Sequence, residues 1–210
     1  MRLTASGLTC QRSGRTVFAG LDFAVASGEA LLVLGRNGAG KSSLLRTIAG
    51  LVRLASGRLI LEGGAPELTL SEQAHYVGHQ DALKSALTVR ENLDFWARYL
   101  GADAPEGGGQ PSADPLAALA LDDLADLPAA YLSAGQKRRL SLARLVAVPR
   151  PIWLLDEPTS ALDAAAQDRL SGLMRDHLAG GGMILAATQG PVGLEPAKEL
   201  RLDGLASCAA

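Results

Sequence analysis

The sequence predicts an α/β fold with a mostly parallel sheet at its core and an inserted helical lobe. Short apolar segments typical of buried strands alternate with segments that carry apolar residues at helical spacing. One predicted strand, residues 29–34, continues into a helix through the glycine-rich stretch 35–43, the connection expected of a phosphate-binding unit. The 210 residues are expected to form one domain, 1–210, with a sizeable core.

The first third of the chain contains most of the predicted strands. Leu21, Phe23 and Val25 alternate along one of them, which indicates a strand with one buried face. Gly50 ends the helix that follows the glycine-rich stretch. Besides residues 29–34, strands are expected at residues 3–9, 21–26, 59–61 and 74–77.

The middle of the chain, at about residues 81–130, has helix-type segments in place of strands and predicts the helical lobe. Thr88 is a helix cap with Glu91 three residues later, a capping box, and the helix is expected to run to Leu100. Residues 101–115 are rich in Gly and Pro and predict a flexible loop. A second short helix is expected at residues 116–127.

The last third returns to alternating helices and strands. Ser133 can cap a helix that runs to about Val148, before Pro149 and Pro151. His177, near the end of a later helix, is interpreted as a favourable charge at the negative end of the helix dipole. The expected segments are strand 152–155, helix 164–179 and strands 183–188 and 199–202.

The glycine-rich stretch reads G-x-x-x-x-G-K-S and predicts a nucleotide site. Its backbone N–H groups and the helix N-terminus would surround the β-phosphate. Lys41 would reach the β- and γ-phosphates, and the Ser42 hydroxyl would bind Mg²⁺. The alternative is a glycine-rich turn with a solvated lysine. The predicted nucleotide-binding residues are Gly35, Arg36, Asn37, Gly38, Ala39, Gly40, Lys41, Ser42 and Ser43.

Two carboxylates follow the apolar strand 152–155. Asp156 is expected to hold the Mg²⁺ shell, because a carboxylate at the end of a buried strand can lie beside the phosphate loop. Glu157 is expected to polarise the water that attacks the γ-phosphate. Without the phosphate loop, a strand-end acidic turn before Pro158 would be the simpler interpretation.

The chain strongly resembles the ATP-binding subunits of ABC transporters, which are P-loop ATPases. The resemblance covers nearly all of the chain and implies an antiparallel β portion beside the parallel sheet. It rests on the phosphate loop, on Gln80 at the Q-loop position, on LSAGQ at 132–136, on LLDE at 154–157 and on SALD at 160–163. It implies a catalytic and metal-binding role for Gln80. It also implies a dimer that sandwiches two ATP molecules, in which Ser133 and Gly135 reach the γ-phosphate held by the second copy.

Two positions depart from the pattern of that family. Members usually carry a histidine after the last core strand, where this sequence has Gln189. Glutamine can donate a hydrogen bond at this catalytic position but carries no positive charge, so slow hydrolysis is expected. The usual adenine-stacking aromatic is absent, and Arg12 occupies its place.

Residues 75–84 and 87–96, with the late run QGPVGL at 189–194, further resemble the CcmA subfamily of cytochrome c biogenesis ATP-binding export proteins. This resemblance implies a peripheral protein on the cytoplasmic face of the bacterial inner membrane. Its implied partners are membrane subunits resembling CcmB and CcmC and, indirectly, the haem chaperone CcmE. ATP hydrolysis would energise haem export or haem delivery. Another small-substrate ABC transporter, or a slow regulatory ABC ATPase, stays open as an alternative.

Composition limits the other function classes. A net charge of −2 suggests no nucleic-acid partner, and no apolar run approaches the roughly 18 residues of a membrane span. No secretory signal is expected at residues 1–16, and Cys10 and Cys208 form no metal-ligand pattern. DNA-repair ABC ATPases would need a long coiled-coil insertion, and guanine recognition would need an Asn-Lys-x-Asp run; both are missing from the sequence.

Overall fold

The computed structural model describes residues 1–101 and 114–202, so the predicted loop at 101–115 lies almost entirely outside the described residues. The described chain forms two compact units. The first contains residues 1–78, 151–158 and those from 174 onward, and the second contains residues 79–150 and 159–173. The predicted lobe at 81–130 falls inside the second unit. The predicted α/β fold is confirmed.

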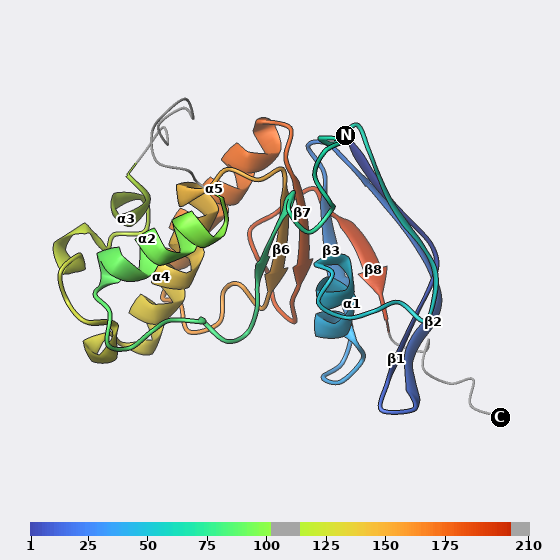
Figure 1. Ribbon diagram of the computed structural model, residues 1–210, viewed down its shortest axis with the longest axis horizontal. Coiled ribbons are helices and arrows are strands. Elements are labelled where there is room, and N and C mark those ends of the chain that lie inside the picture. Colours follow the sequence, from blue (N-terminus) through green and yellow to red (C-terminus); the bar gives the residue numbers. More distant parts are fainter. Residues whose placement is uncertain (102–113, 203–210) are drawn as a thin grey trace. The chain divides into compact units, whose positions relative to one another are not determined.

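The first unit contains a five-stranded sheet in which every neighbouring pair is parallel (Figure 1). Its strand order is β5-β6-β7-β3-β8, so β7 lies between the strand before the glycine-rich stretch and the strand before Asp156. The carboxyl ends of parallel strands share one edge, and that edge holds the candidate site. The strands are β3 (Ala30–Leu34), β5 (Ala74–Val77), β6 (Ile152–Asp156), β7 (Met183–Ala187) and β8 (Lys198–Arg201).

An antiparallel sheet in the order β2-β1-β4 completes the first unit. It comprises β1 (Arg2–Arg12), β2 (Arg15–Ala26) and β4 (Ser56–Glu62). β1 and β2 extend beyond the predicted strands 3–9 and 21–26. They continue toward each other and form one hairpin. Ser13 and Gly14 make its two-residue turn with φ of 49° and 76°, the conformation that matches the twist of a hairpin.

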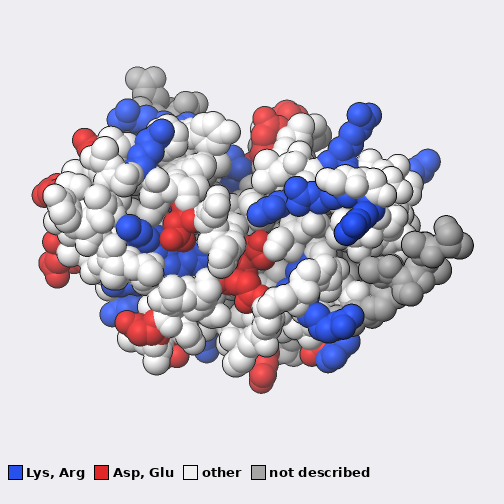
Figure 2. Space-filling model, turned by 90° about the horizontal axis from the view of Figure 1, so that it is seen from below, with Lys and Arg blue, Asp and Glu red and all other residues white. Residues whose placement is uncertain are grey.

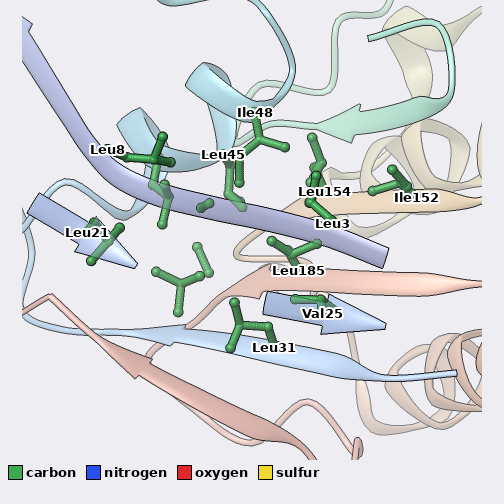
Figure 3. Close-up of a cluster of buried hydrophobic side chains, with 14 of the residues drawn as sticks. Leu3, Leu8, Leu21, Val25, Leu31, Leu45, Ile48, Ile152, Leu154 and Leu185 are labelled. Atoms are coloured by element: carbon green, nitrogen blue, oxygen red, sulfur yellow. The ribbon is translucent and has the colours of Figure 1, made fainter. Parts of the chain in front are cut away.

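The core of the first unit lies where the antiparallel sheet, the parallel sheet and α1 (Lys41–Ile48) pack together (Figure 3). Leu45 and Ile48 of α1 are 0% and 1% exposed. Burying a leucine or isoleucine contributes about 1.5–3 kcal/mol, so this cluster fixes α1, and with it the loop before it. Figure 3 labels Leu3, Leu8, Leu21, Val25, Leu31, Leu45, Ile48, Ile152, Leu154 and Leu185.

His177 and Trp153 form a stacked pair in this unit, with ring centroids 4.0 Å apart and an interplanar angle of 10°. Burial lowers the pKa of His177 to about 4, so the imidazole is neutral at neutral pH. The interpretation of His177 as a charge at the helix end is therefore wrong. Burial, rather than the helix dipole, determines its protonation state.

The second unit is helical. Its elements include α2 (Val89–Tyr99), α3 (Pro115–Ala118), α4 (Ala134–Ala147) and short 3₁₀ turns at Asp122–Leu124 and Ala129–Tyr131. Both predicted caps are confirmed: Thr88 pairs with Glu91 and Ser133 with Gln136 in capping boxes. The helix predicted at 116–127 is wrong beyond Ala118, because Ala120 adopts a φ of 52° that interrupts it.

The helix α5 (Ala164–Ala179) agrees with its predicted bounds. In the described part of the chain no helix is long and apolar enough to span a bilayer. On the face drawn in Figure 2, Lys and Arg are interspersed with Asp and Glu among uncharged residues. A single-sign electrostatic field does not dominate that face.

Candidate nucleotide site

The glycine-rich stretch lies between β3 and α1, as predicted. Gly38 and Gly40 have φ of 83° and 104°, conformations that L side chains rarely adopt. A Cβ on Gly40 would lie 2.7 Å from Val17 Cγ1, so strand β2 leaves no room for a side chain there. The loop therefore keeps its curve through backbone geometry, and a glycine-rich turn at a helix N-terminus is suited to directing N–H groups at phosphate oxygens.

Lys41 reaches back across this loop from the first turn of α1. Its side chain is 7% exposed, and Nζ donates hydrogen bonds to the carbonyls of Gly35 at 2.6 Å and Arg36 at 3.4 Å. The ammonium group is thus held inside the curve of the loop. A fixed positive charge beside a helix N-terminus is suited to binding phosphate.

Ser42 and Asp156 meet as the sequence predicts. The Ser42 hydroxyl donates to Asp156 Oδ1 at 3.0 Å, and Asp156 is 2% exposed at the last position of β6. Hard oxygen donors of this kind suit Mg²⁺, which usually takes one or two protein ligands and completes its shell with water and phosphate. No cluster of three His, Cys, Asp or Glu side chains that could hold a metal is found in residues 1–101 and 114–202. The chemistry of the Ser42 hydroxyl and the Asp156 carboxylate would suit a Mg²⁺ that is bound together with nucleotide.

Tyr76 and Arg46 also belong to this group, and the sequence analysis missed them. Tyr76 Oη donates to Asp156 Oδ2 at 3.3 Å and accepts a hydrogen bond from Arg46 Nε at 3.1 Å. Burial raises the pKa of the Tyr76 phenol. In the sequence, Tyr76 has a place in the predicted strand 74–77 and in the run 75–84, but neither indicates a contact with Asp156, which is 80 residues away.

Glu157, Gln189 and Asn37 come together from three strand ends. Glu157 has a φ of 47°, an unusual conformation for a non-glycine residue, and its N–H bonds to the Ala187 carbonyl at 2.8 Å. Gln189 Nε2 donates to Asn37 Oδ1 at 2.6 Å and lies 3.4 Å from Glu157 Oε1. Because β7 lies between β3 and β6, Gln189, two residues beyond β7, reaches both neighbours.

Three predicted site residues, Gln80, Ser133 and Gly135, lie in the second unit. Ser133 caps α4, and a Cβ on Gly135 would lie 2.8 Å from the Ala161 carbonyl oxygen. Gln80 is exposed. Their predicted contacts with nucleotide stay predictions, as does adenine stacking by Arg12, which lies exposed at the β1–β2 hairpin.

Comparison with known proteins decides the family. Residues 18–160 match the ABC transporter family. A curated relative from Nitrobacter winogradskyi, named cytochrome c biogenesis ATP-binding export protein CcmA, is 61% identical over 206 residues, covering 98% of this chain and 100% of its own. The chain belongs to the CcmA family of ABC transporter ATP-binding proteins. Both resemblances seen in the sequence are confirmed.

Other CcmA proteins and solved structures agree with this assignment. The CcmA of Bradyrhizobium diazoefficiens is 58% identical over 206 residues, with 98% of this chain and 100% of its own covered. A solved ATP-binding subunit of an ABC transporter matches with a TM-score of 0.78 at 26% identity, over 90% of this chain and 80% of its own. A Pyrococcus furiosus ABC transporter ATP-binding protein has a TM-score of 0.80 at 19% identity, over 99% and 100%, and supports the fold. This CcmA-family chain is accordingly an ATP-binding protein of the ABC type.

Proposed function

We propose that this chain hydrolyses ATP to ADP and phosphate within a membrane ABC complex, and that hydrolysis energises haem export or delivery in c-type cytochrome biogenesis. The observation that carries the proposal is the full-length similarity to CcmA, 61% over 206 residues. The Ser42–Asp156 pair and the neighbouring Glu157 supply the groups that this chemistry needs. The fold alone would not identify the cargo.

Each site residue is assigned a separate role in the proposed reaction. Lys41 binds and orients the β- and γ-phosphates, while Ser42 and Asp156 would hold Mg²⁺, which neutralises charge on the phosphate oxygens. The oxygen of a water molecule attacks the γ-phosphorus, the bond to the β–γ bridging oxygen breaks, and Glu157 accepts the proton of the water. Gln189 orients Glu157 through its neutral amide. Gln80 is proposed to assist both the metal and the attacking water.

The partners follow from the family. A second copy would complete each site with Ser133 and Gly135, since this chain has one phosphate loop and one LSAGQ segment. We propose that the dimer docks on membrane subunits resembling CcmB and CcmC, acts indirectly on the haem chaperone CcmE, and is peripheral on the cytoplasmic face of the inner membrane. Co-expression with those subunits should move the protein into the membrane fraction. Carbonate-resistant membrane binding without them would contradict this arrangement.

Two assays test the proposed function. The chain, expressed in a bacterium that lacks its own CcmA, should restore covalent haem attachment to c-type cytochromes, as detected by haem staining. Glu157→Gln should fail to restore it and should accumulate an ATP-bound dimer, because the residue keeps its size but cannot accept a proton. Parental ATPase activity in Glu157→Gln would refute the assigned base. Full ATPase activity in the parent without any haem attachment would instead favour another cargo.

A further inference from the structure

Tyr76 is placed to reach the carboxylate that would hold Mg²⁺ from the neighbouring strand. β5 pairs with β6 in parallel, with Tyr76 opposite Leu154, so its Cα lies two residues before the level of Asp156. Two residues of strand span about 6.6 Å. The phenol ring covers that offset and brings Oη to 3.3 Å from Asp156 Oδ2.

Arg46 determines the direction of this contact. Its Nε donates to Tyr76 Oη at 3.1 Å, and a guanidinium group has no acceptor. The phenol therefore accepts from Arg46 and keeps its single proton for another partner. Asp156 Oδ2 is within reach of that proton. Arg46 therefore donates to Tyr76, and Tyr76 donates to Asp156.

The two oxygens of Asp156 thus receive hydrogen bonds from two different elements. Ser42 at the start of α1 donates to Oδ1, and Tyr76 on β5 donates to Oδ2. Two donors on opposite oxygens oppose rotation of the carboxylate about its Cβ–Cγ bond. Asp156 is 2% exposed, so solvent contributes little to that orientation.

Gly78 provides the space for the phenol. A Cβ on Gly78 would lie 3.1 Å from both Tyr76 Cε1 and Tyr76 Oη, and 3.2 Å from Cζ. These distances are tighter than most contacts of a real Cβ, so with a side chain here the ring would have to shift by a few tenths of an ångström. The glycine at residue 78 therefore leaves room for the Tyr76 ring in the position where its hydroxyl reaches Asp156.

We propose that Tyr76, oriented by Arg46, is a positioning residue that holds the Asp156 carboxylate in the orientation needed to bind Mg²⁺ with nucleotide. The inference rests on the proposed ATPase function and adds two residues that lie outside the phosphate loop, the Q-loop position, LSAGQ, LLDE and SALD. Tyr76 does not touch the reacting atoms. Its role is to act through Asp156.

The test compares nucleotide binding with and without the metal. A fluorescent ATP analogue is titrated into parent and Tyr76→Phe proteins, in MgCl₂ and separately in EDTA, with thermal unfolding as a check on folding. Tyr76→Phe should weaken binding in Mg²⁺ by about three- to tenfold, less than the full effect of a hydrogen bond to a charged group because Tyr76 acts on the metal only through Asp156, and leave binding in EDTA unchanged. Tyr99→Phe makes the same chemical change at a tyrosine that is 72% exposed, and should alter neither titration.

Arg46→Met tests the direction of the donors. Alone it should weaken Mg²⁺-dependent binding less than Tyr76→Phe, and in the Tyr76→Phe background it should add no further loss, because Arg46 acts through Tyr76. Gly78→Ala should resemble Tyr76→Phe, since it shifts the ring. Equal weakening in Mg²⁺ and EDTA, or additive losses in the double variant, would overturn the inference. A parent that binds no analogue in MgCl₂ would instead refute the proposed function.

Discussion

The side-chain amide nitrogen of Gln189 donates a 2.6 Å hydrogen bond to Asn37 Oδ1 and lies 3.4 Å from Glu157 Oε1. This single amide, two residues beyond β7, connects that strand end with the phosphate loop and with the proposed base. Because Asn37 accepts the bond, the Nε2 end of the amide is turned toward Glu157. A donor therefore occupies the position where related proteins use histidine, but it carries no charge.

Gln189→His is expected to raise kcat. A charge-assisted hydrogen bond is worth about 1.5–3 kcal/mol, which corresponds to at most about one to two decades in rate if the transition state alone gains it. ATP affinity should change little, since Lys41 and the loop amides are expected to supply most of the ground-state contacts. Steady-state ATPase assays with the membrane partner present give both quantities.

Gln189→Leu is the matched control, because it keeps a similar volume and removes both hydrogen bonds. It should lower kcat below the parental value. If Gln189→His left kcat unchanged or lower, the surrounding residues would be adapted to the amide. Residue 189 would then not limit the chemistry.

Lys41→Met is expected to weaken ATP binding strongly while preserving the fold. Lys41 is 7% exposed, so methionine retains most of its packing and removes only the charge and its bonds to Gly35 and Arg36. Losing the interactions of one buried ammonium group with phosphate should weaken binding at least about tenfold. Isothermal titration with ATP measures this loss. Lys137→Met, at a half-buried position of α4, controls for the removal of a lysine, and an unchanged ATP affinity in Lys41→Met would contradict the assignment.

Local sequence signals predicted the phosphate loop, both helix caps and most strands. The G-x-x-x-x-G-K-S spacing and the Ser/Thr-x-x-Glu/Gln caps are determined within a few residues, and the structure places Thr88 and Ser133 accordingly. The meeting of Ser42 and Asp156 also followed, since each is at the end of a predicted strand or loop.

Contacts that depend on strand order could not be read from the sequence. Nothing local indicates that β7 lies between β3 and β6, and this order brings Gln189 to Asn37 and Glu157. Tyr76 was likewise predicted only as part of a strand. Its contact with Asp156 depends on the pairing of β5 with β6, which the sequence does not indicate. The helix predicted at 116–127 had suitable apolar spacing, but the helix ends at Ala118. Ala120 has a left-handed backbone conformation that cannot continue it.

Gly135→Ala is expected to destabilise the helical unit. A Cβ at this position would lie 2.8 Å from the Ala161 carbonyl oxygen, which belongs to the backbone and cannot rotate away. Overpacking of this kind costs about 1–3 kcal/mol. Gly172→Ala is a matched control in the same unit, because a Cβ there meets nothing within 4 Å in the middle of α5. It should stabilise by about 0.5–1 kcal/mol, so urea unfolding should move in opposite directions for the two variants.

The stability of the protein is expected to fall in mild acid because of His177. Burial against Trp153 lowers the pKa of His177 to about 4, whereas an unfolded histidine titrates near 6.5. Between those values the unfolded state binds the proton and the folded state does not. The contribution of neutral His177 is therefore complete above about pH 6.5 and is lost as the pH falls toward 4.

His177→Phe should remove this dependence while keeping an aromatic ring on Trp153. The free energy of unfolding, measured by urea titration at several pH values, should fall less steeply for the variant below pH 6.5. With a partly exposed ring the difference should reach about 2 kcal/mol near pH 4.5. Above pH 7.5 histidine is neutral in both states, so the two proteins should show parallel pH dependence there, which provides the internal control. Equal slopes in acid would show that the stacked imidazole accepts a proton as readily in the folded chain as in the unfolded one.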